Sequence, residues 1–149
     1  MNVSKASMEL YAVTDRSWLR EGETLAQKVK EAAEAGITFL QLREKHLDLT
    51  AMIAEGRGLR TVADAYGIPF VVNDSLEAAL ACGADGVHVG QSDMAVAQAR
   101  KLLGPEKIVG ASVQTVEQAL LAQESGADYL GVGVLWQYLL LPLHHSYYI

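Results

Sequence analysis

Residues 70–93 read FVVNDSLEAALACGADGVHVGQSD, and this stretch decides the fold. Two short apolar runs, at 70–72 and 86–89, each end in polar residues, and a helix-like segment joins them. In a parallel sheet, both runs would bring those polar side chains to one edge, at the carboxyl ends of the strands. The stretch therefore predicts a strand–helix–strand unit with a site at its carboxyl edge.

Two carboxylates, Asp74 and Asp93, follow the two apolar runs about one strand–helix unit apart. Mg²⁺ binds one or two protein carboxylates and leaves its other positions to water and substrate phosphates. The pair is therefore a candidate Mg²⁺ site. The alternative is structural, because Asp is also a favoured N-cap residue where a helix follows a strand. The position of Asp74 alone leaves both interpretations open.

A short sequence pattern recurs along most of the chain. A helix end, a glycine and an apolar strand follow one another at 35–40, 82–87 and 125–130. Six strands are expected, at 10–13, 37–42, 70–72, 86–90, 107–112 and 129–133. Helical periodicity at 23–35 and 47–66 separates the first three. Strands that alternate with helices in this way indicate an α/β fold with a parallel sheet.

Alternation within the strands separates an apolar face from a mixed one. Gln41 and Arg43 share one side of the second strand, and His88 shares a side of the fourth with two glycines. Ser112 lies on the glycine-bearing side of the fifth. A barrel interior whose upper layer lines a site has this pattern. His88 by itself is better explained as a packed core histidine than as a catalytic base.

Residues 41–45 read QLREK and form a second chemical motif. Arg43 and Lys45 would place two cations at the carboxyl edge of the sheet, where they suit an anion. Arginine can bind phosphate oxygens through two parallel hydrogen bonds. The alternative is an ordinary solvated loop in which Glu44 pairs with a neighbour at little net energy.

Composition and charge exclude several classes of function. The 149 residues correspond to one domain, and the net charge of −6 comes with no basic run. Nucleic-acid binding is not expected, because it requires clustered Lys and Arg. Membrane insertion is not expected either, since the apolar stretch near the end is shorter than the about 20 residues that a span needs. Cys82 is the single cysteine, which fits a reducing cytoplasm and a small buried helix residue.

Five motifs together are specific. They are, in order, YAVTDR at 11–16, QLREK at 41–45, VND at 72–74, GADGVHVGQSDM at 83–94 and GADYLGVG at 126–133. This series closely resembles thiamine-phosphate synthase over about residues 8–133. The resemblance implies a fold of TIM (β/α)8-barrel type with about six βα units present. It also implies a transferase that joins hydroxymethylpyrimidine diphosphate to thiazole phosphate, with Mg²⁺ as cofactor and pyrophosphate as the released product.

The resemblance assigns roles to the residues that the motifs contain. It implies that Arg43, Lys45 and Asn73 hold the diphosphate and that Asp74 and Asp93 bind the metal. Such groups would stabilise the charge that gathers on departing pyrophosphate.

The same resemblance implies a pyrimidine site. Gln41 and Ser112 would contact the ring, and His88 and Tyr11 would shape its pocket. No residue is assigned as a nucleophile, because a cation-like pyrimidine needs orientation and dry walls more than covalent help.

The sequence departs from the family after residue 133. The family has a Thr- and Lys-containing loop there, whereas residues 134–138 read VLWQY, and no Asp, Glu, Lys or Arg follows Asp128. The expected domains are a partial barrel at 1–133 and a divergent apolar tail at 134–149. An incomplete barrel would leave its first and sixth strands open, which favours homo-oligomerisation or other self-association through that edge. Synthase activity is expected to be impaired. The alternatives are an inactive fragment that binds only diphosphate and Mg²⁺, and a protein similar to thiazole tautomerase.

Overall fold

The computed structural model describes residues 3–90 and 96–132. Its strands form one parallel sheet in which each strand pairs with the next along the chain. The strands are β1 (Tyr11–Val13), β2 (Phe39–Leu42), β3 (Phe70–Asn73), β4 (Gly86–Val89), β5 (Ile108–Val113) and β6 (Tyr129–Val132). Among the described residues, β1 and β6 are the two end strands of the sheet.

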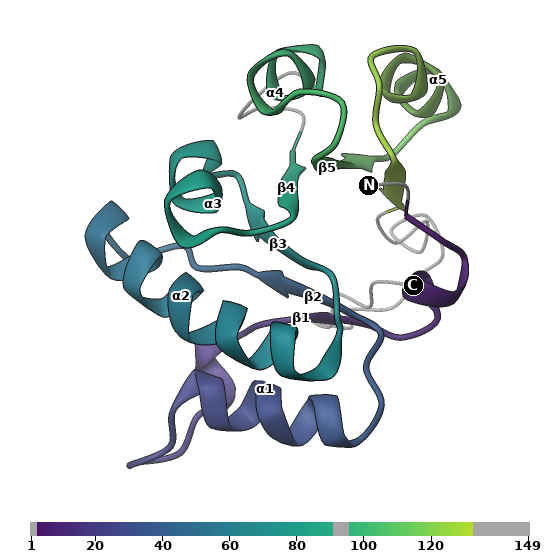
Figure 1. The fold of residues 1–149 in the computed structure, drawn as a ribbon. Helices are drawn as coiled ribbons and strands as arrows, with labels where there is room; N and C mark the ends of the chain where they lie inside the picture. The colour runs from purple at the N-terminus through teal and green to yellow at the C-terminus, as the bar shows by residue number, and fades with distance from the viewer. Residues whose placement is uncertain (1–2, 91–95, 133–149) are drawn as a thin grey trace, which may run out of the picture.

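One α-helix follows each of the strands from β1 to β5. The helices are α1 (Leu25–Glu34), α2 (Leu49–Tyr66), α3 (Leu76–Cys82), α4 (Val96–Leu103) and α5 (Val116–Glu124), and the 3-10 turns are η1 (Ala6–Met8) and η2 (Arg16–Trp18). The sheet curves, and all five helices lie on its convex side (Figure 1). This is the α/β arrangement of TIM-barrel type that the sequence predicts, with six strands described.

Local sequence sets the ends of the helices. Thr24 caps α1 in a reciprocal pair of hydrogen bonds with Gln27, so two of the unpaired amide groups in the first turn are satisfied. At their carboxyl ends, α2 and α3 stop at Gly67 and Gly83, whose φ values are 65° and 75°. Glycine adopts this left-handed conformation without steric cost, which is why the predicted helix boundaries are close to those observed.

The two faces of the sheet have different cores. Toward the helices, the strands bury a continuous apolar cluster to which α2 contributes Leu59. Toward the concave side, Phe39, Val71 and Ile108 are fully buried and pack with Tyr129. Gly110 leaves room for that ring, because a Cβ there would lie 2.1 Å from a carbon of Tyr129.

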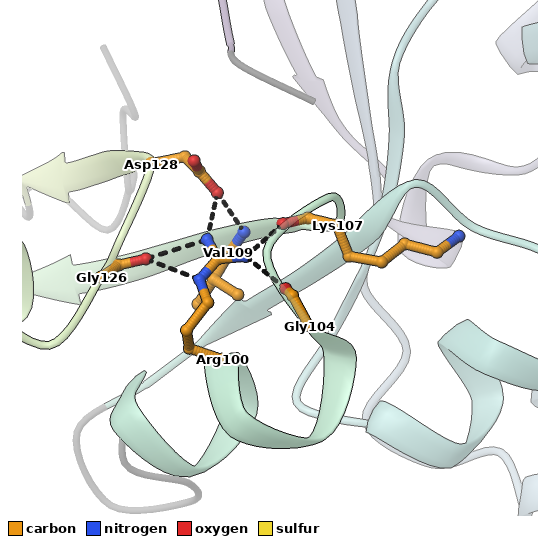
Figure 2. Close-up of polar contacts among 6 residues, drawn as sticks. All are labelled: Arg100, Gly104, Lys107, Val109, Gly126 and Asp128. Atoms are coloured by element: carbon orange, nitrogen blue, oxygen red, sulfur yellow. Dashed lines mark hydrogen bonds and ion pairs between the residues drawn. The ribbon is translucent and has the colours of Figure 1, made fainter.

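Two of the repeated glycine cassettes bind a strand to the one before it at the amino edge of the sheet. Asp128 accepts a hydrogen bond from the amide of Val109 at 2.8 Å (Figure 2). Asp85 accepts one from the amide of Phe70, also at 2.8 Å, and pairs with Arg60 at 2.7 Å. The two Gly-Ala-Asp motifs therefore have a structural role in joining neighbouring strands.

Arg100 on α4 completes the second of these connections (Figure 2). Its Nη2 donates to Asp128 at 2.6 Å, and Nε and Nη2 both donate to the carbonyl of Gly126. Its Nη1 donates to the carbonyls of Gly104 and Lys107, at 2.8 and 2.6 Å. All five N–H groups of the guanidinium are therefore used within the fold.

The described residues include no helix that is long and apolar enough to cross a membrane. The predicted apolar tail at 134–149 lies outside the described residues, and its assignment as a separate segment stays a prediction.

Candidate active site

A cavity of about 800 Å³ lies at the carboxyl ends of β2 to β5. Its walls contain polar side chains from each of these strands or from the loops that follow them. The lining residues are Gln41, Arg43, Glu44, Lys45, His46, Met52, Asn73, Asp74, Ser75, His88, Gly90 and Ser112. Seven of the nine residues predicted from the sequence are among them.

Of the other two predicted residues, Tyr11 is not among the lining residues, and Asp93 is not among the described residues. Tyr11 is below the cavity, where its hydroxyl accepts a hydrogen bond from Nε2 of Gln41 at 3.0 Å. Asp93 falls in the segment 91–95, outside the described residues, so its place relative to Asp74 stays a prediction.

Asp74 is not the N-cap of the helix that follows it. That position belongs to Ser75, whose Oγ accepts a hydrogen bond from the amide of Ala78 at 3.1 Å. Asp74 instead has a φ of 61°, the one non-glycine residue in the described ranges with a positive value. Its carboxylate accepts hydrogen bonds from the amide of Gly90, at 3.3 Å, and from the side chain of Asn73. The capping interpretation of Asp74 is therefore wrong.

The backbone at Asp74 carries a functional implication. A left-handed conformation costs a non-glycine residue roughly 1–2 kcal/mol, although Asp tolerates it better than most. Such conformations persist where the surrounding structure enforces them, and they cluster at ligand sites. Here the Asp74 amide donates to the carbonyl of His88 at 2.9 Å, which joins the ends of β3 and β4. The conformation thus places an exposed carboxylate on the cavity wall.

The cationic wall comes from the loop after β2. Arg43 is half-buried and Lys45 is exposed, and neither side chain makes an ion pair or hydrogen bond with another described residue. Glu44 behaves differently. Its side chain is 6% exposed and pairs with Arg16 at 2.7 Å. Glu44 does pair with a neighbour, as the structural alternative required, but it is buried rather than solvated.

A chain of hydrogen bonds runs below the cavity floor. From Gln41 it passes to Tyr11, then to the hydroxyl of Tyr129 at 2.7 Å. Tyr129 contacts Nδ1 of His88 at 2.9 Å, and Nε2 of His88 contacts Ser112 at 2.8 Å. Four of these five groups are sequence-predicted, and Tyr129 is the one that was missed. Its position on the concave side of β6 was visible in the strand alternation, but its contacts were not.

The hydrogen bonds from Gln41 to Ser112 have a preferred direction of donation. Tyr11 accepts from Gln41, so its own proton is satisfied if it donates to Tyr129. Tyr129 then donates to Nδ1 of His88, and Nε2–H of His88 donates to Ser112. The reverse direction would leave the Tyr11 proton without an acceptor in a buried position, which costs about 1–3 kcal/mol. The favoured direction leaves the Ser112 hydroxyl proton available to the cavity.

Burial keeps the side chains of this hydrogen-bond series uncharged. It lowers the pKa of His88 from 6.5 to about 4. It raises the pKa of Tyr11 and that of Tyr129 well above the ordinary phenol value. At neutral pH this hydrogen-bond series therefore supplies directed hydrogen bonds and no charge. The charged groups lie at the rim of the cavity.

The residues present are compatible with a magnesium ion. Mg²⁺ prefers oxygen ligands and keeps several waters, so a single carboxylate beside a phosphate can be enough. Asp74 offers such a carboxylate on the same cavity as Arg43 and Lys45. Among the described residues, no three or more His, Cys, Asp or Glu side chains are grouped so that they could hold a metal ion by themselves.

Comparisons with known proteins identify similar sequences. A family model described as thiamine monophosphate synthase matches residues 10–137. The thiamine-phosphate synthase of Clostridium acetobutylicum is 44% identical over 128 residues, which are 86% of this chain and 60% of that protein. That of Ruminiclostridium cellulolyticum is 45% identical over 133 residues, with 89% and 63% covered.

A solved structure is also similar. Thiamine phosphate pyrophosphorylase from Pyrococcus furiosus matches with a TM-score of 0.79 and 39% identity, over 87% of this chain and 62% of that one. The chain thus spans about three fifths of the length of the curated relatives it matches, 60% in the case of the clostridial protein.

Proposed function

We propose that this chain, which belongs to the thiamine monophosphate synthase family, binds hydroxymethylpyrimidine diphosphate in the described cavity. In the complete reaction the pyrimidine would be joined to thiazole phosphate, giving thiamine phosphate and pyrophosphate. The observation that carries the proposal is the convergence of Arg43, Lys45, Asp74 and the buried chain ending at Ser112 on one cavity. No described residue is assigned to the thiazole phosphate.

The diphosphate would lie against the cationic wall. Arg43 can donate two parallel hydrogen bonds to phosphate oxygens, and Lys45 adds a compact charge. Asn73, which lines the same cavity, would donate through its side-chain amide. As the bond between the pyrimidine methylene carbon and the diphosphate oxygen breaks, negative charge grows on the leaving group. Positioned cations stabilise that charge in the transition state.

Asp74 would hold Mg²⁺, with Asp93 as the second proposed ligand. Bound Mg²⁺ would neutralise negative charge on the diphosphate oxygens. The contribution of the chain itself is orientation, because the hydrogen bonds from Gly90 and Asn73 fix the direction of the Asp74 carboxylate.

The pyrimidine would lie over the buried hydrogen-bond series that runs from Gln41 to Ser112. The Gln41 amide and the Ser112 hydroxyl would hydrogen-bond to ring nitrogens and substituents, and the rings of Tyr11 and His88 would limit the pocket below. Because the pKa of His88 is about 4, His88 is neutral at physiological pH and does not act as a general acid. Its role is to orient Ser112, so the reacting carbon is held in place without a bond to any protein atom.

Calorimetric titration with pyrophosphate, with and without Mg²⁺, tests the diphosphate site. We expect Mg²⁺-dependent binding that Asp74→Ala and Arg43→Ala weaken. Asp64→Ala is a matched control, since Asp64 is an exposed carboxylate on α2 that pairs with Arg60 away from the cavity. Binding that is equally tight in Asp74→Ala and without metal would refute the assignment. A tautomerase-like protein, which shares the fold without the metal chemistry, would give that same result.

The buried free thiol of Cys82 is compatible with our proposal of a reducing, cytoplasmic setting.

A further inference from the structure

We propose that Thr14 and Arg16, in the loop after β1, act as a clamp that positions Arg43 and Lys45 for the diphosphate. The inference rests on the proposed diphosphate site and assigns positioning residues to it. Neither Thr14 nor Arg16 lines the cavity, and both act through the loop that follows β2.

The first part of the clamp is a pair of hydrogen bonds from one hydroxyl. Thr14 is only 6% exposed. Its Oγ1 accepts from the amide of Arg43 at 2.9 Å and donates to the carbonyl of Arg43 at 3.4 Å. Its own amide donates to the carbonyl of Gln41 at 3.0 Å, just beyond the last paired residues of β1 and β2. The Thr14 side chain thus continues the strand pairing by one residue and fixes the backbone that carries the Arg43 side chain.

The second part of the clamp is an ion pair. Nε of Arg16 lies 2.7 Å from the carboxylate of Glu44, and Nη2 of Arg16 also contacts Glu55 on α2. Glu44 is the residue between Arg43 and Lys45, and its side chain is almost fully buried. Anchoring the middle residue restricts both neighbours, whose side chains lie on the cavity wall.

This arrangement has a physical advantage for binding. Ordering a long side chain on binding costs affinity, so a backbone already held in the binding conformation gives a lower Kd. A positively charged clamp residue also offsets the buried Glu44 charge, which would otherwise repel the diphosphate. Loss of the clamp should therefore raise the Kd for the anion, in addition to any decrease in the free energy of unfolding.

The chain contains a matched control for this claim. At the opposite end of the same two strands, Oγ1 of Thr38 accepts from the amide of Leu10 at 2.8 Å and donates to its carbonyl at 3.3 Å. The two threonines therefore make the same pair of bonds, one at the amino edge and one beside the cavity. Thr14→Val and Thr38→Val each remove one pair with little change in volume.

The test combines urea unfolding with calorimetric titration of pyrophosphate and Mg²⁺. We expect both valine variants to unfold at a lower urea concentration than the wild type. Only Thr14→Val should raise the Kd for pyrophosphate, by about tenfold, and Thr14→Ser should bind like the wild type. Hydrogen exchange of the Arg43 amide, measured without ligand, should accelerate in Thr14→Val and stay unchanged in Thr38→Val.

Arg16→Gln removes the ion pair from the residue that does not line the cavity and keeps the Glu44 charge, so it carries the test if Thr14→Val does not fold. We expect it to weaken pyrophosphate binding severalfold. Wild-type affinity in the folded Thr14→Val protein, or in Arg16→Gln when that valine variant is unfolded, would overturn the clamp and leave the diphosphate site intact. Equal loss of affinity in Thr14→Val and Thr38→Val would show a general effect of stability and would also overturn it. Absence of binding in the wild type would overturn the proposed function, and the clamp with it.

Discussion

Burial of His88 makes the stability of the folded chain depend on pH in a defined direction. Its pKa is 6.5 in an ordinary environment and about 4 in the fold, because burial disfavours the charged ring. Between these values the unfolded chain binds a proton that the folded chain does not. The free energy of unfolding therefore falls as the pH is lowered through that window. At about 1.4 kcal/mol per pKa unit, the full loss is about 3 kcal/mol, of which about 2 kcal/mol is reached by pH 5.

Urea unfolding followed by far-UV circular dichroism at about pH 8 and about pH 5 measures this loss. His88→Gln cannot gain a charge, so its stability should change by about 2 kcal/mol less than that of the wild type between the two conditions. His46→Gln is the control, since His46 is exposed at the cavity rim. Equal pH dependence in the wild type and His88→Gln, or a His88 ring that titrates near 6.5 by NMR, would refute the burial argument.

Four other substitutions have expected outcomes that unfolding experiments can check. Tyr129→Phe breaks the buried hydrogen-bond chain and should cost about 1–3 kcal/mol, and a neutral result would show that water replaces the hydroxyl. A Cβ added at Gly58 has no other atom within 4 Å, so Gly58→Ala should stabilise α2 by up to about 1 kcal/mol. Gly56→Ala should destabilise the protein, because the new Cβ would lie 2.8 Å from Sγ of Cys82. Arg100→Lys keeps the charge but loses the planar set of donors, and should cost about 1.5–3 kcal/mol; unchanged stability would mean that its five bonds are not needed.

The arrangement of strands and helices could be predicted because local signals repeat. Each glycine cassette marks a helix end and the next strand, so the six strands lie close to the expected ranges. The observed end of a strand differs from the expected one where a side chain hydrogen-bonds to the neighbouring backbone. The second strand was expected from residue 37, yet β2 begins at Phe39. Thr38 uses its hydroxyl as well as its amide to bind Leu10, and this local solution is not visible as a change in hydrophobic pattern.

The site was predicted less completely, because its details depend on contacts across the sheet. Asp and Ser are comparable N-caps, so the pair Asp74-Ser75 could not be resolved from sequence. The hydrogen bonds of Asp74 to Gly90 and of its amide to His88 decide between them, and these depend on the neighbouring strand. Tyr129 reaches Tyr11, 118 residues away in the chain, only because the sheet curves. The roles proposed for the cavity residues stay predictions until binding is measured.

The two edges of the sheet use arginine in opposite ways, and the difference separates a structural role from a binding role. At the amino edge, Arg100 uses every N–H group on the fold, so it has none left for a ligand. At the carboxyl edge, the guanidinium of Arg43 makes no hydrogen bond or ion pair with another described residue, while its backbone is held on both sides by Thr14. A fixed backbone with an uncommitted charged group is the arrangement that anion binding requires. By this criterion the amino edge of the sheet stabilises the fold, and the carboxyl edge is where a diphosphate would bind.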